Sequence, residues 1–263
     1  MAYSYRMVGA VRRVLKPTGY TLVPEDRLGY LEQQALKAEK AAILRMLPDA
    51  ERGRALDLLD ESKSQLNQDF FALHRSGWKR DGYFVEFGAT DGLTLNNSWL
   101  LEKAFGWSGI LAEPARMWRD VLQNSGRTAR LEFDCVWSKT GETLRFSEAS
   151  WGELSTLEQF QGSDGNQRRR TGTYPVQTAS LNDLLVRHDA PREMDFLSID
   201  TEGSEYDILK AFDFERYRFG CIACEHNFTP KRELIHDLLS ANGYRRVFTE
   251  FSQFDDWYVD TTT

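Results

Sequence analysis

The chain has 263 residues, of which 41% are hydrophobic, so it carries enough apolar material for one sizeable core and is neither disordered nor a mini-protein. Its 33 Lys and Arg against 40 Asp and Glu give a net charge of -7, which argues against nonspecific nucleic-acid binding. Its three cysteines cannot form a fully paired framework, so we expect a reducing, cytoplasmic setting.

Residues 1–60 are predicted to form a helical N-terminal extension. From Pro24 to about Asp60 the apolar residues recur at helical spacing. Pro48 is expected to end one helix, and Ser64 to cap the next, which Gly77 stops. The first 80 residues are therefore predicted to be wholly helical, and the extension is a candidate surface for homo-oligomer formation.

The first 20 residues make a poor signal peptide, because basic side chains surround and interrupt a short apolar run. These side chains are Arg6, Arg12, Arg13 and Lys16. A basic amphipathic helix here would be a weak anchor on anionic lipid. Since no apolar run approaches the ~20 residues that span a bilayer, we expect peripheral membrane contact at most.

After Gly82 short β-rich runs alternate with helical stretches, which is typical of an α/β fold with a parallel sheet. The predicted strands are 83–87, 109–113, 195–200 and 219–225, and the predicted helices are 94–105, 115–123, 180–188, 204–211 and 230–241. Two last runs, 244–250 and 256–260, have no helix between them and are predicted to form an antiparallel hairpin at the sheet edge. The middle section adds strands at 130–136, 143–147 and 174–178 and a loop at 161–173. Residues 61–263 are thus predicted to form one α/β domain.

The clearest motif is an acidic turn between the first strand and its helix. Glu86, Gly88 and Asp91 lie in the stretch EFGATDG. Glycine at the end of a parallel strand lets the backbone approach a ligand closely. At the end of the next strand Glu113 stands where a ribose diol is usually held. The acidic turn would repel a pyrophosphate, so a positively charged nucleoside, S-adenosylmethionine, is favoured over a dinucleotide.

Two more strand ends carry acidic residues. The stretch SIDTEGSE (198–205) places Asp200 and Glu202 after one strand, and CEHN (224–227) places Glu225 and His226 after the next. Capping alone would explain Ser204 and Glu205. In a doubly wound sheet these ends face one crevice, so we expect the carboxylates to gather there. His226 is either a structural residue or a ligand or catalytic group.

Two other patterns have plain explanations. Cys221 and Cys224 lie three apart in a strand and should point to opposite faces, which disfavours a redox or zinc site. The run Arg168, Arg169 and Arg170 is usually a solvated loop, although contact with an acidic substrate group is the alternative.

These motifs together resemble the FkbM-type methyltransferases, which use S-adenosylmethionine and have the class I fold. The likeness spans about residues 64–258 and rests on SQLNQD (64–69), GYFVEFGATDGLTLNNSWLLEKAFGWSGILAEP, DCVWSKTG and SIDTEGSEYDIL followed by CEHN. It implies a seven-stranded, Rossmann-like sheet, mostly parallel, whose last two strands form the antiparallel hairpin. It also implies O-methylation of a sugar hydroxyl, in surface glycan or secondary-metabolite biosynthesis.

The resemblance also implies a set of site residues. The implied cofactor contacts are Gln65, Gln68, Glu86, Gly88, Asp91, Asn96, Ser98, Glu113, Asp134 and Cys135. For the chemistry, a general base or a divalent cation must assist the hydroxyl. The candidate catalytic residues are Asp200, Glu202 and His226, and without a metal His226 or Glu202 would be the base. The candidate ligands of Mg²⁺ or Mn²⁺ are Asp200, Glu225 and His226. The alternatives are a nucleotide-dependent oxidoreductase or epimerase, which would lack its glycine fingerprint here, and a non-catalytic binding module.

Overall fold

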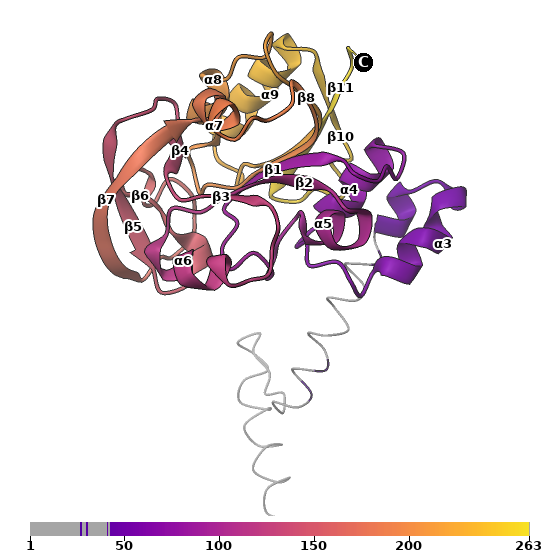
Figure 1. Ribbon diagram of the computed structural model, residues 1–263, viewed down its shortest axis with the longest axis horizontal. Helices are drawn as coiled ribbons and strands as arrows, with labels where there is room; N and C mark the ends of the chain where they lie inside the picture. The colour runs from indigo at the N-terminus through magenta and orange to yellow at the C-terminus, as the bar shows by residue number, and fades with distance from the viewer. Residues whose placement is uncertain (1–26, 28–29, 31–40, 42, 263) are drawn as a thin grey trace, which may run out of the picture. The chain divides into compact units, whose positions relative to one another are not determined.

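The structure is a computed structural model that describes residues 27, 30, 41 and 43–262 (Figure 1). The chain divides into two compact units, Met1–Ala42 and Ile43–Thr263. In the first unit, the guanidinium of Arg27 lies 5.3 Å from the ring centroid of Tyr30. The predicted basic N-terminal segment lies wholly outside the described residues, and the predicted helix before Pro48 lies mostly outside them.

The second unit begins with helical chain that contributes to its core. Helix α3 covers Asp49–Leu58, and Ile43, Leu47 and Ala55 are buried against the α/β fold. Residues 43–58 therefore belong to the same compact unit as the sheet. Between Leu58 and Gln68 the chain forms turns and a short bridge, so the prediction of an entirely helical first 80 residues was wrong.

A seven-stranded sheet forms the centre of the second unit, in the order β10-β11-β9-β8-β1-β2-β3. Strands β3, β2, β1, β8 and β9 run parallel, and β11 is antiparallel to both β9 and β10. The strands are β1 (Tyr83–Phe87), β2 (Ser108–Ala112), β3 (Arg130–Glu132), β8 (Glu193–Ile199), β9 (Arg218–Glu225), β10 (Tyr244–Val247) and β11 (Asp255–Asp260). The predicted α/β fold class and its C-terminal antiparallel hairpin are confirmed.

Helices cover both faces of this sheet (Figure 1). They are α4 (Gln68–Arg75), α5 (Trp99–Phe105), α6 (Arg116–Gln123), α7 (Leu181–Arg187), α8 (Glu205–Lys210) and α9 (Lys231–Ala241). Helices α4 and α5 share a core with Phe84, whereas α7, α8 and α9 share one with Val85, because successive strand residues face opposite sides. No helix in the described part is long and apolar enough to cross a membrane.

The two cysteines of β9 follow the same alternation. Cys221 belongs to the core beneath α4, and Cys224 belongs to the core beneath α8 and α9. Both thiols are free and buried. The prediction that they face opposite sides of the strand is confirmed.

A smaller four-stranded sheet, in the order β4-β7-β5-β6, holds the middle section. Its elements are β4 (Cys135–Trp137), β5 (Thr143–Ala149), β6 (Thr156–Leu157) and β7 (Arg170–Ser180), with 3-10 turns η2 (Gly152–Leu154) and η3 (Glu158–Phe160). The single strand predicted at 130–136 is divided between the two sheets. Glu132 accepts the N–H groups of Phe133 and Asp134 at 2.9 and 3.0 Å, and this local turn ends β3. Strand β7 also takes up the end of the predicted 161–173 loop.

Helix α5 begins later than predicted. Asp91 Oδ1 accepts the N–H groups of Leu93 and Thr94 at 2.8 and 2.7 Å, which holds the chain after β1 in a turn. The helix starts only at Trp99. The segment from Gly88 to Ser98 is consequently a loop at the carboxyl end of β1, and we call it the β1–α5 loop.

Candidate active site

A cavity of about 280 Å³ lies at the carboxyl ends of β1, β2, β8 and β9. Residues 152–155 with Leu157 line it from the smaller sheet, and Phe254 lines it from the chain before β11. Of the residues predicted to bind the cofactor or take part in catalysis, seven line this cavity: Gln65, Gly88, Glu113, Cys135, Asp200, Glu202 and Glu225. The structure therefore brings acidic residues from the ends of several strands to one crevice, as predicted.

Gly88 and Glu113 form the end of the cavity above β1 and β2. Gly88 has φ +74°, and a Cβ atom there would lie 2.2 Å from the backbone oxygen of Asp200. Glu113 is buried, and its carboxylate accepts N–H groups of Thr90 at 2.9 Å and Ala115 at 2.8 Å. These bonds fix the carboxylate while leaving lone pairs for a ligand hydroxyl.

Three carboxylates face the cavity from β8 and β9. One oxygen from each of Asp200, Glu202 and Glu225 lies within 4.8 Å of the others. Asp200 and Glu225 are hydrogen-bonded to one another, and burial together with Asp200 raises the pKa of Glu225 well above its usual range. Burial and the nearby Asp255 carboxylate raise the pKa of Asp200 to about 7. The pair therefore holds a proton on Glu225 and leaves Asp200 able to accept one near neutral pH.

Glu202 differs from the other two because a buried cation binds it. Arg168 forms a short ion pair with Glu202 and a bidentate pair with Asp164 at 2.6 Å. Its guanidinium also donates from Nε to the Leu154 oxygen at 2.9 Å. Arg168 is thus a buried link between the 161–169 loop and β8, which corrects the expectation of a solvated side chain.

His226 does not join the carboxylates. Its Nδ1 accepts the Phe228 N–H at 2.9 Å, and its Nε2 lies 3.8 Å from Asp256. The ring is buried away from the cavity lining, and burial lowers its pKa. The structure therefore does not bring together Asp200, Glu225 and His226, the set predicted to bind a metal. The oxygen-only set with Glu202 has the donor chemistry of a hard cation, but Arg168 already compensates part of its charge.

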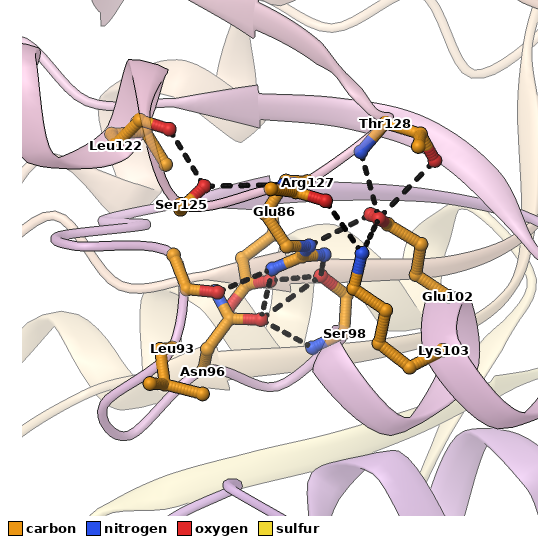
Figure 2. Close-up of polar contacts among 12 residues, drawn as sticks. Glu86, Leu93, Asn96, Ser98, Glu102, Lys103, Leu122, Ser125, Arg127 and Thr128 are labelled. Carbon is orange, nitrogen blue, oxygen red and sulfur yellow. Dashed lines mark hydrogen bonds and ion pairs between the residues drawn. The ribbon is translucent and has the colours of Figure 1, made fainter.

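The motif residues Glu86, Asn96 and Ser98 do not line the cavity. Their side chains lie in a polar network with Arg127 (Figure 2). Glu86 accepts the Asn97 N–H at 2.7 Å and a short bond from the Ser98 hydroxyl. Asp91 likewise serves the turn described above. Their predicted contacts with the cofactor stay predictions, and the structure gives each of them a role in shaping the loop.

The remaining predicted cofactor residues form two pairs in which one member lines the cavity. Gln65 lines it, whereas the buried Gln68 donates to Asp255 at 2.8 Å. Cys135 lines it, whereas Asp134 pairs with Arg187 at 2.9 Å.

The sequence motifs did not predict several residues that line the cavity. They are Thr90, Thr94, Asn97, Leu154, Ser155, Asn166, Asn227 and Phe254, among others. Asn97 and Asn227 lie within two of the quoted motifs, so a polar residue after a strand end is the signal that could have indicated them. Leu154 and Ser155 come from the smaller sheet, for which no periodic pattern marks the cavity.

A parallel sheet with an antiparallel last hairpin, and an acidic cavity at its carboxyl edge, define a class I methyltransferase fold. The model of the methyltransferase FkbM domain matches residues 72–246, and the chain belongs to this family. No curated protein matches the sequence.

Two solved structures are among those to which the chain is similar. A proposed RNA methyltransferase from Pyrococcus horikoshii is 11% identical, with a TM-score of 0.36 over 74% of this chain and 82% of that one. Precorrin-6y C5,15-methyltransferase from Geobacter metallireducens is 11% identical, with a TM-score of 0.38 over 68% of this chain and 72% of that one.

The acidic cavity predicts a pH-dependent stability. Burial raises the pKa values of Glu113, Asp200 and Asp255 to about 7, above their ordinary values near 4. The native state therefore binds protons that the unfolded state releases, and the resulting stabilisation is lost as the pH rises through 7. We expect Tm to rise by several degrees between pH 8 and pH 6.5 in thermal unfolding. Glu113→Gln should make this dependence shallower, and a Tm that falls over this range would contradict the assignment.

Proposed function

We propose that this S-adenosylmethionine-dependent methyltransferase transfers a methyl group to a hydroxyl of a sugar acceptor, as part of a glycan or as a small molecule. The observation that carries the proposal is the hydrogen-bonded Asp200 and Glu225 pair facing the cavity. A sugar hydroxyl is a weak acid, so its methylation needs a proton acceptor at the site of transfer.

The residues present fit the cofactor of the family. The carboxylates that face the cavity suit a ligand with ammonium and sulfonium charges. Glu113, fixed by two backbone N–H groups, is positioned to accept hydrogen bonds from a ribose diol. When bound, S-adenosylmethionine supplies an electrophilic methyl group.

Asp200 would act as the general base. Its carboxylate would take the hydroxyl proton as the hydroxyl oxygen gains the methyl group and the carbon–sulfur bond of the cofactor breaks, and Glu225 would donate a hydrogen bond that keeps Asp200 oriented. Glu202 is held by Arg168 and would bind a second acceptor hydroxyl. A divalent ion on the same carboxylates would instead lower the pKa of the hydroxyl. Turnover with EDTA and with added Mg²⁺ or Mn²⁺ distinguishes the two mechanisms.

Exposed aromatic rings next to the cavity support a sugar acceptor. Trp151 precedes the lining residue Gly152 and is 74% exposed, and Phe228 follows the lining residue Asn227 and is 70% exposed. Aromatic faces offer an apolar platform for a sugar ring, while nearby carboxylates accept its hydroxyl hydrogens.

Calorimetry tests the cofactor assignment. Wild-type protein should bind S-adenosylhomocysteine with micromolar affinity, and Glu113→Ala should weaken binding by at least about tenfold, because a carboxylate that holds two hydroxyls is removed. NAD serves as the control ligand and should not bind. If wild-type protein binds neither S-adenosylmethionine nor S-adenosylhomocysteine, the proposed methyl transfer is contradicted.

A further inference from the structure

Arg127 is buried behind the β1–α5 loop, with 0% of its side chain exposed. Its Nε donates to Glu102 at 2.7 Å. One terminal nitrogen donates to the Gly92 oxygen at 2.8 Å and to Asn96 Oδ1 at 2.7 Å, and the other donates to Ser98 Oγ at 2.8 Å (Figure 2). The planar guanidinium thus uses donors on all three nitrogens, in fixed directions.

Three of these four acceptors belong to the β1–α5 loop. The same loop presents Thr90, Thr94, Leu95 and Asn97 to the cavity. Arg127 itself does not line the cavity. Arg127 therefore contacts the β1–α5 loop on the side opposite to the one that forms the wall of the candidate cofactor site.

The network continues from Arg127 to Asn97. The Ser98 hydroxyl that receives the Arg127 bond donates to Glu86, and Glu86 accepts the Asn97 N–H at 2.7 Å. The Asn97 side chain then donates to Ser198 Oγ at 2.9 Å, which ties the loop to β8. A cavity-lining residue is in this way fixed by a side chain that never reaches the cavity.

We propose that Arg127 is a positioning residue for cofactor binding, which holds the β1–α5 loop in the shape that the cofactor requires. The inference rests on the proposed function, because it takes the ligand of the cavity to be S-adenosylmethionine. It goes beyond that function by placing a determinant of cofactor affinity outside the cavity.

The test is Arg127→Lys, which keeps the positive charge but cannot reach four acceptors with one ammonium group. We expect the Kd for S-adenosylhomocysteine and the KM for S-adenosylmethionine to rise about tenfold, the effect of losing roughly one charged hydrogen bond. At saturating cofactor kcat should stay within about threefold of wild type, because the carboxylates on β8 and β9 are unchanged.

The matched control is Arg218→Lys. Arg218 forms a similar ion pair, with Asp260, and donates to the Asn242 oxygen at 2.8 Å, at the opposite end of β9. This variant should lower Tm without changing the Kd. Hydrogen exchange should show faster amide exchange at residues 89–98 in Arg127→Lys only.

Asn96→Ala gives a second variant in case Arg127→Lys does not fold. It removes one acceptor of Arg127 from a side chain outside the cavity lining, and we expect about fivefold weaker binding of S-adenosylhomocysteine. If wild type binds and either folded variant binds equally well, the positioning role is overturned while the proposed function stands. If wild type binds no S-adenosylhomocysteine, both fail.

Discussion

Replacing Asp200 by Asn should lower kcat by about 10²–10⁴-fold, the usual contribution of a general base, while leaving affinity for S-adenosylhomocysteine close to that of wild type. The amide fills the same space but cannot take a proton. It also removes a negative charge from a group of three carboxylates within 4.8 Å, so the fold should not suffer.

The pH dependence gives this prediction a second readout. In wild type, burial places the pKa of Asp200 at about 7, so kcat should rise with pH through about 7 as the carboxyl group loses its proton. The residual activity of Asp200→Asn should not show this rise. Steady-state turnover at saturating cofactor, measured between pH 5.5 and pH 9, decides the point.

Two other variants make the assignment specific. Glu225→Gln keeps a hydrogen-bond donor toward Asp200, so its kcat should fall less than that of Asp200→Asn. Asp189→Asn changes an exposed carboxylate outside the cavity and at a φ of 51°, which Asn tolerates, and should behave as wild type. The assignment of Asp200 as the base fails if Glu225→Gln is the more damaged enzyme. If EDTA abolishes turnover and Mg²⁺ or Mn²⁺ restores it, the carboxylates act through a metal instead.

Much of the fold was predictable because each parallel strand carries its own local signal. The run YFVEF is rich in aromatic and β-branched residues and is followed by glycine, and the structure places β1 at Tyr83–Phe87, as predicted. The C-terminal hairpin was predictable because two β-rich runs had no room for a helix between them. The topology then followed from general rules for alternating strands and helices.

The predicted element bounds were wrong where local polar hydrogen bonds interrupt a periodic pattern. The helix was predicted to begin at residue 94, yet the Asp91 carboxylate holds the chain in a turn and α5 begins only at Trp99. Glu132 ends β3 in the same way. Such bonds depend on side-chain geometry, which residue spacing does not reveal.

The candidate site was predictable in position and only partly in detail. Asp200, Glu202 and Glu225 face the cavity because parallel strands end at one edge of the sheet. The sequence did not indicate that Glu86, from the same kind of position, bonds to Ser98 near the charge of Arg127, because Arg127 comes from a loop 41 residues later. It could not place His226 either, because one residue along a strand end changes the face to which a side chain points.

Gly88→Ala should destabilise the protein by roughly 2–6 kcal/mol, the sum of backbone strain at positive φ and of overpacking. Gly88 has φ +74°, and the added Cβ would lie 2.2 Å from the backbone oxygen of Asp200. A backbone atom cannot swing aside as a side chain can, so the ends of β1 and β8 must separate. That movement displaces Asp200 as well, and binding of S-adenosylhomocysteine should be lost with the stability.

Gly141→Ala isolates the effect of the close approach. Gly141 has φ +83°, but nothing lies within 4 Å of the position of its Cβ, so only the strain of about 1–3 kcal/mol applies. Urea unfolding of both variants gives the two free energies of unfolding directly. If Gly88→Ala is no less stable than Gly141→Ala, the contact between the ends of β1 and β8 is looser than the structure places it. A clear excess loss in Gly88→Ala would mean that this glycine is required by the Asp200 backbone itself, before any cofactor enters the cavity.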